Sequence, residues 1–229
     1  MAALIAPGAP IMVVYLPSSN TSSLPAGVRK IEIDVLGEDA LVYALQDINI
    51  VLYSSMQEVA GLMPNSLIGD EGVSGEYGFI KAMSRTTVKL FVPSDLGLRY
   101  GEEGRLIPFI KPKEDLQQAV REAGIPMTVV LIGDFAEYTL SIYAMGIDLK
   151  GNRLVYTANA AFEKAMVTSE LSTRDYVAAA YLSIFAANPV SDIQNWVISL
   201  SELAPTGEEI AAVMKQKHGA EPKVVTRSL

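Results

Sequence analysis

The sequence predicts an α/β fold in which helices cover both faces of a parallel sheet. Half of the 229 residues are apolar, which is enough to build a sizeable core. Short apolar runs such as 48–53 and 127–132 carry no charge, as expected for strands buried on both faces. These runs alternate with segments of helical periodicity, and this alternation is typical of a parallel sheet.

The first part of the chain supplies most of the expected sheet. Apolar, β-branched runs predict strands at 11–16, 28–35, 48–53, 88–92 and 127–132. Helical spacing predicts helices between them at 38–46, 79–84 and 115–123. Gly124 follows the last of these helices and Pro126 lies just beyond, a common way for a helix to end.

After Asp134 the alternation becomes looser, which indicates a smaller α+β lobe packed on the sheet. Short strands are expected at 154–156, 165–167 and 196–200, and helices at 173–187 and 205–218. Thr206 and Glu209 have the spacing of a capping box, and Gly219 ends the last helix. The chain is therefore expected to divide into a sheet domain, 1–136, and a C-terminal lobe, 137–229.

Composition excludes several classes of function. The net charge of −8 argues against direct contact with nucleic acid, where clustered Lys and Arg are needed. The absence of cysteine and the single histidine, His218, exclude disulfides, thiolate nucleophiles and metal sites that need Cys or several His ligands. No apolar run approaches ~18 residues, and no basic segment precedes the apolar N-terminal stretch. We therefore expect a cytoplasmic protein without a membrane span.

Five sequence blocks resemble, in the same order, those of one known family. They are KLFVPSDLG at 89–97, AVREAGIPMT at 119–128, GDF at 133–135, STRDYVAA at 172–179 and WVISLSEL at 196–203. The chain resembles the NmrA-like, isoflavone-reductase-like branch of the atypical short-chain dehydrogenase/reductases. This resemblance implies a Rossmann-like fold and descent from NADP-dependent reductases of small aromatic or secondary-metabolite carbonyls and enones.

The N-terminal region departs from the family pattern. Family members begin with a strand, a glycine-rich turn and a helix that together bind the cofactor diphosphate. Here LIAPGAPIMVV at 4–14 resembles the end of that helix running into the second strand. The following residues, 16–19, are LPSS, where the family tends to place a basic residue for a 2′-phosphate. We therefore expect the first strand and turn to be missing, and NADP binding to be weak or lost.

A missing first strand would leave a gap in the sheet. The strands at 11–16 and 48–53 are then expected to pair directly, or a partner chain in a homodimer to cover the gap. A fold-back of residues 2–6 as an antiparallel filler is the alternative. A parallel filler is excluded, because a parallel crossover needs about a dozen residues and only 7–10 are available.

The segment GDEGVSG at 69–75 matches the spacing G-x-x-G-x-x-G. It could be a displaced phosphate loop or a flexible surface loop. Asp70 and Glu71 would repel a phosphate, which favours the surface loop.

The resemblance assigns chemistry to two segments. Lys113 stands thirteen residues before Pro126, the offset of the family's catalytic lysine, which implies a general acid/base role. Glu114 and Asp115 follow it, so a solvated lysine in a first helical turn is the alternative. Ser94 and Asp95 correspond to the family's Pro-Ser-Glu segment beside nicotinamide and substrate. They are catalytic candidates, or they cap a turn.

Further positions follow from the resemblance alone. It implies that Asp34 and Val35 hold the adenine, and that Ser54 and Ser55 line the cofactor ribose. Pro93 and Phe135 are also expected beside the cofactor. Substrate contacts are expected at two further residues, Gly133 and Tyr138.

Three functions stay open on the sequence. The first is a small-molecule site in a degenerate NAD(P)-binding cleft, derived from the reductases. The second is a redox-silent sensor or binding protein. The third is a cofactor-independent isomerase, cyclase or lyase that uses the vacated cleft, with Lys113 or Asp95 as the acid or base.

Overall fold

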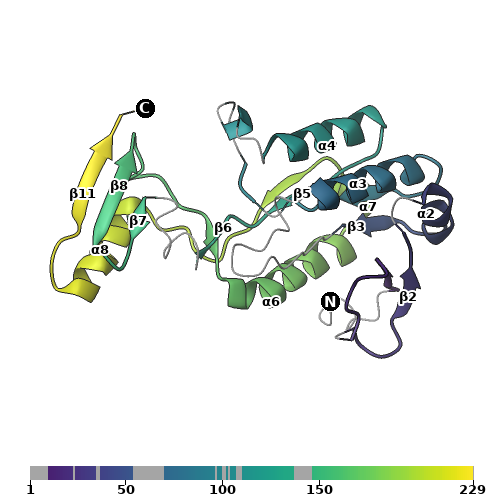
Figure 1. Cartoon of the computed structure of the whole chain (residues 1–229), viewed down its shortest axis with the longest axis horizontal. Coiled ribbons are helices and arrows are strands. Elements are labelled where there is room, and N and C mark those ends of the chain that lie inside the picture. The colour runs from purple at the N-terminus through teal and green to yellow at the C-terminus, as the bar shows by residue number, and fades with distance from the viewer. Residues whose placement is uncertain are drawn as a thin grey trace. The chain divides into compact units, whose positions relative to one another are not determined.

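The computed structural model divides the chain into two compact units (Figure 1). One unit comprises Met1–Val130 and Ala178–Ile198, and the other Leu131–Val177 and Ser199–Leu229. The expected division into 1–136 and 137–229 stays a prediction. The structure describes residues 10–22, 24–34, 37–53, 70–95, 97–99, 102, 104–106, 110–136 and 146–228.

Two parallel strand pairs lie in the first unit. β1 (Met12–Tyr15) pairs with β2 (Arg29–Glu32), and β3 (Ile50–Leu52) pairs with β4 (Leu90–Val92), both in parallel. A parallel bridge from Phe91 to Met127 joins β4 to the segment that leads into β5 (Val129–Leu131). β5 in turn pairs with β10 (Val197–Ser199). Every residue of β4 and β5 is buried, which confirms the predicted sheet covered on both faces.

Three helices alternate with these strands, as the sequence predicts. They are α2 (Glu38–Ala44), α3 (Asp70–Met83) and α4 (Lys111–Glu122). α3 packs against both α2 and α4. A short 3₁₀ turn, η2 (Gly104–Leu106), precedes α4.

The expected direct pairing of the strands at 11–16 and 48–53 is wrong for the described residues. β1 bonds to β2 from Met12 onward, and the Ile33 N–H extends this ladder to the Tyr15 carbonyl at 2.9 Å. β3 lies in a separate sheet with β4. Residues 2–6, the alternative filler, lie outside the described part of the chain. The homodimer stays a prediction.

The helix α3 is longer than the sequence predicts. Both interpretations of residues 69–75 as a loop are wrong from Asp70 onward, because α3 begins there. Glycine lowers helix propensity by about 1 kcal/mol per residue. Packing stabilises the helix in spite of its glycines, because Phe79, Ile80 and Met83 are buried on one helical face against the neighbouring elements.

The C-terminal helices follow the predicted order. α6 (Glu170–Tyr181) continues into a π-helical turn, η3 (Leu182–Ala186), and the short α7 (Val190–Ile193) follows. No helix in the described ranges is both long and apolar enough to cross a membrane.

In the second unit, a small mixed sheet and the helix α8 lie side by side (Figure 1). β8 (Arg153–Thr157) lies between β7 (Ile147–Asp148), which is antiparallel to it, and β11 (Lys223–Arg227), which is parallel. α8 (Gly207–His218) packs on this sheet through Ile210 and Met214. The predicted capping box of Thr206 and Glu209 is confirmed, and Gly219 ends the helix at φ 68°.

Gly133 has a structural reason to be glycine. It stands just before β6 (Asp134–Phe135), which pairs with β9 (Val167–Thr168). Its φ is 76°, and a Cβ added there would overlap the Met166 carbonyl. Its predicted contact with substrate stays a prediction.

Replacing Gly133 by Ala is therefore expected to destabilise the protein by about 3 kcal/mol, from left-handed strain and overpacking together. Gly219→Ala is the matched control, since Gly219 has a similar φ of 68° but nothing within 4 Å of its added Cβ. That control should cost only about 1 kcal/mol. Urea unfolding of both variants measures the difference. Equal losses would show that the Met166 carbonyl does not restrict this position.

Candidate active site

A single peptide segment after β4 collects the predicted catalytic residues. Pro93, Ser94 and Asp95 follow this strand directly, at its carboxyl end, where ligands bind in open α/β sheets. The Ser94 N–H donates to Oε2 of Glu76 from α3 at 3.2 Å. The Ser94 carbonyl accepts a hydrogen bond from Nζ of Lys113 on α4. One residue is thus held from two sides by side chains of opposite charge.

Lys113 is not a solvated lysine. It lies in the first turn of α4, which is anchored by the fully buried Leu116 and Val120. Its side chain turns inward and is partly buried. Burial lowers the pKa of Lys113, and the nearby carboxylates of Asp95 and Glu76 oppose this effect. The first turn of a helix is also an unfavourable place for a cation.

Glu76 completes the site, and the sequence analysis missed it. Glu76 is only 2% exposed. Burial raises the pKa of Glu76 to about 7, although the Ser94 N–H and Lys113 act in the opposite direction. Spacing in the sequence could have identified it. Glu76 precedes Phe79, Ile80 and Met83 by three, four and seven residues, which places all four on one face of a helix. An acidic residue on the buried face of a helix requires partners, and here they are Ser94 and Lys113.

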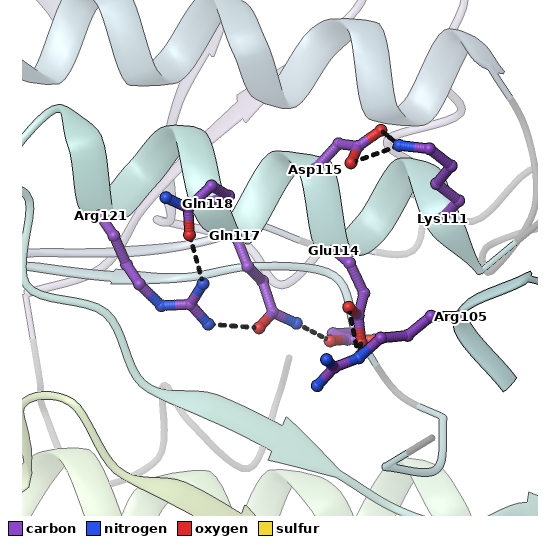
Figure 2. A network of polar contacts seen from close by, with 8 residues as sticks. Arg105, Lys111, Glu114, Asp115, Gln117, Gln118 and Arg121 are labelled. Carbon is purple, nitrogen blue, oxygen red and sulfur yellow. Dashed lines mark hydrogen bonds and ion pairs between the residues drawn. The ribbon is translucent and has the colours of Figure 1, made fainter. Parts of the chain in front are cut away.

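Asp95 is linked to the surface through α4. Burial raises its pKa, and Lys113 and a hydrogen bond from Gln117 Nε2 act against this rise. Figure 2 shows Arg121 directed at both Gln117 and Gln118. The guanidinium donates to the Gln117 side-chain oxygen at 3.2 Å, so the amide of Gln117 connects a buried carboxylate to an exposed cation.

Two ion pairs beside this network are exposed and contribute little. Lys111 pairs with Asp115 one turn along α4, and Arg105 pairs with Glu114 at 2.8 Å (Figure 2). Solvent-exposed pairs of this kind are typically worth less than about 1 kcal/mol. The electrostatic character of the site therefore depends on its buried groups.

Tyr53 follows β3 and lies on the α3 side of the site. Its ring meets that of Phe79 edge to face, with centroids 5.4 Å apart. Burial and the charge of Glu76 raise the pKa of Tyr53 to about 12, so its hydroxyl keeps its proton at neutral pH.

The Ser94 hydroxyl is the feature of this site that points most directly to a ligand. Ser94 is 4% exposed, and its Oγ has no hydrogen-bond partner among the described residues. Buried polar atoms are nearly always satisfied, so this hydroxyl is available for a hydrogen bond to a water or a ligand.

The structure thus brings together the predicted residues Pro93, Ser94, Asp95 and Lys113. Asp34 lies after β2, and Phe135 and Gly133 belong to the second unit. The remaining predicted residues lie outside the described part of the chain: Val35, Ser54, Ser55 and Tyr138. No cluster of three metal-ligating side chains occurs in the described ranges.

No protein-family model and no curated protein sequence matches the chain. Solved structures do. The chain is similar to a structure titled isoflavone reductase, at 19% identity and a TM-score of 0.68, with 99% of this chain and 73% of that one covered. It is also similar to AtPrR2, solved with NADP+ and (+)-pinoresinol, at 18% identity, a TM-score of 0.68 and the same coverage.

A third similar structure is leucoanthocyanidin reductase from Vitis vinifera with NADPH. Its identity is 17% and its TM-score 0.63, with 99% of this chain and 72% of that one covered. The chain has the fold of these reductases. The Rossmann-like fold that the sequence blocks predict is thereby confirmed.

The segment where the family resemblance places the 2′-phosphate contact offers no cationic side chain. Residues 10–22, which contain β1 and the turn after it, include neither lysine nor arginine. The Ser19 N–H in this turn donates to the Leu16 carbonyl at 2.9 Å, and the Ser22 N–H to Asn20 Oδ1 at 3.0 Å. These two donors are therefore already engaged within the turn.

The raised pKa of Glu76 predicts a pH-dependent stability. Folding favours its protonated form, so its contribution to stability is fully present below pH 4.5 and is lost as the pH rises through about 7. Relative to Glu76→Gln, the wild type should lose about 3 kcal/mol across this range. The amide oxygen of Gln can still accept the Ser94 N–H, so packing is preserved.

Urea unfolding of both proteins at a series of pH values measures this difference. Glu114→Gln is the control, because the Glu114 carboxylate pairs with Arg105 at the surface. Its free energy of unfolding should change with pH as that of the wild type does. Parallel curves for the wild type and Glu76→Gln would show that Glu76 titrates normally.

Proposed function

We propose that the site after β4 binds a small aromatic or secondary-metabolite carbonyl or enone, and that Lys113 exchanges a proton with its oxygen. The observation that carries this proposal is the partly buried Lys113 ammonium on the Ser94 carbonyl, with a pKa lowered by burial. A lysine whose pKa is lowered gives up its proton more readily than a solvated one, as a general acid requires. The shared fold with solved reductases supports descent from NADP-dependent enzymes.

Neighbouring groups have distinct roles in this proposal. The unpartnered Ser94 Oγ hydrogen-bonds the ligand oxygen beside Lys113. Asp95 accepts a hydrogen bond from Gln117, and its carboxylate acts to raise the pKa of the Lys113 ammonium. For Gly133 and Tyr138, the contact with substrate rests on the family resemblance alone.

Dinucleotide binding is weak or lost in this proposal. The lack of a basic residue in 10–22 supports it, because a 2′-phosphate requires a positive partner. The remaining dinucleotide positions are those that the family resemblance assigns: Asp34, Val35, Ser54, Ser55, Pro93 and Phe135.

Thermal unfolding tests binding directly. Aromatic ketones and enones, at about ten times their dissociation constant, should raise Tm by roughly 3–5 °C, because a ligand bound by the folded state stabilises it. Lys113→Met should abolish this rise. NADPH at millimolar concentration should give a much smaller one.

Lys111→Met is the matched control, since Lys111 lies on the same helix and pairs at the surface with Asp115. It should bind as the wild type does. A ligand response that survives in Lys113→Met would remove Lys113 from the site. A large NADPH response would show that the dinucleotide site is intact.

One observation favours a cofactor-independent isomerase or lyase as a second candidate. Burial shifts the pKa of Glu76 up to about 7 and that of Lys113 down, which brings a carboxyl acid and an amine towards the same pH range. A pair of this kind can supply both an acid and a base for moving a proton next to a carbonyl group.

Proton exchange in D₂O without any nicotinamide tests this candidate. An enolisable aromatic ketone should exchange its α-protons in the presence of the wild type, and Lys113→Met should lower the rate by at least about 100-fold. NMR follows the exchange. Lys111→Met should retain the wild-type rate. Absence of exchange with the wild type would exclude this candidate.

A further inference from the structure

Glu76 is the one ionisable residue among the fully buried residues that the structure describes. Its carboxylate forms no direct hydrogen bond or ion pair with Lys113. Instead, the two side chains bind opposite polar groups of Ser94, the N–H and the carbonyl. Both are therefore fixed to one rigid piece of backbone between β4 and the turn that follows.

We propose that Glu76 is a positioning residue, which fixes the Lys113 ammonium through the backbone of Ser94 and whose charge governs when Lys113 releases its proton. The proposal deepens the proposed function, on which it rests for the assignment of the working proton to Lys113. Glu76 itself is not required to touch a ligand.

The geometry supports the positioning role. An N–H donor bonded to a carboxylate and a carbonyl acceptor bonded to an ammonium are both charge-assisted hydrogen bonds, which are about twice as strong as neutral ones. Removing Glu76 would free one side of Ser94 and let its carbonyl, and with it Lys113, change position. The pair therefore holds the segment between α3 and α4.

The charges around Glu76 support its influence on proton release by Lys113. Lys113 on α4 and Asp95 after β4 act on its carboxylate, and Tyr53 after β3 senses its charge. From α2, Glu38 and Asp39 are paired with Arg85 at the exposed end beyond α3. Glu114 acts on Asp95. Lys113 is the cation in this group, so protonation of Glu76 removes one of the two carboxylates that stabilise its ammonium.

NMR of the ligand-free protein tests the coupling. The Ser94 amide reports the ionisation of Glu76, because its N–H donates to that carboxylate, and the Lys113 Cε signal reports the ammonium. In the wild type, both signals should show an inflection near pH 7, where Glu76 titrates. In Glu76→Gln both inflections should vanish, and the main Lys113 midpoint should fall by about one pH unit.

The controls separate charge from packing. Gln keeps the acceptor for Ser94, so a merely structural role would leave the Lys113 midpoint unchanged in Glu76→Gln. The Lys111 Cε signal, from the exposed lysine on the same helix, should not change. Lys113→Arg assigns the Lys113 signal.

An inflection near pH 7 in the Ser94 amide without one in Lys113 would overturn the proposal, and this comparison needs only the wild type. So would a Lys113 midpoint that is equal in wild type and Glu76→Gln. Because no ligand is present, failure of the proposed function, which would appear as absent carbonyl binding, is distinguishable from failure of this coupling.

Discussion

The backbone of Ser94 is the constraint on which the candidate site depends. Its N–H is bonded to a buried carboxylate and its carbonyl to a partly buried ammonium, so two helices and one strand end meet at a single residue. Each of these charges would be costly to bury alone. Together they compensate one another through the peptide group without forming a direct ion pair. This arrangement leaves the Ser94 hydroxyl unpartnered among the described residues.

Burial acts in opposite directions on the two ionisable groups of this arrangement. It destabilises the charged form of each, which raises the pKa of Glu76 and lowers that of Lys113. Lys111 and Asp115 form a lysine–carboxylate pair on the same helix that is exposed to water and therefore weak. Burial is thus what distinguishes Glu76 and Lys113 from this surface pair.

Much of the fold could be predicted from the sequence, because uncharged apolar runs such as 127–132 are hard to place except in a covered sheet. Only the second part of α3 could be predicted, because the glycines at its start weaken the local helical signal and the helix depends on packing against α2 and α4. β11 was also missed. Its residues are all exposed, and it forms because β8 offers an edge in parallel register. Pairing of this kind depends on a distant partner, which local periodicity does not reveal.

The contrast between local sequence signals and distant packing partners also explains which site residues could be predicted. Lys113, Ser94 and Asp95 lie in segments with family-like spacing, whereas Glu76 lies in the first half of α3, directly after the segment 69–75 whose glycines favour a loop. The position of Glu76 also bears on how proton transfer and phosphate binding are divided between the elements of this fold. The proposed acid–base groups are held by α3, β4 and α4, and among the described residues the turn after β1 makes no hydrogen bond to them. In the proposed function, phosphate binding and proton transfer therefore depend on different elements, so sequence change could remove the first while the geometry of the second persists.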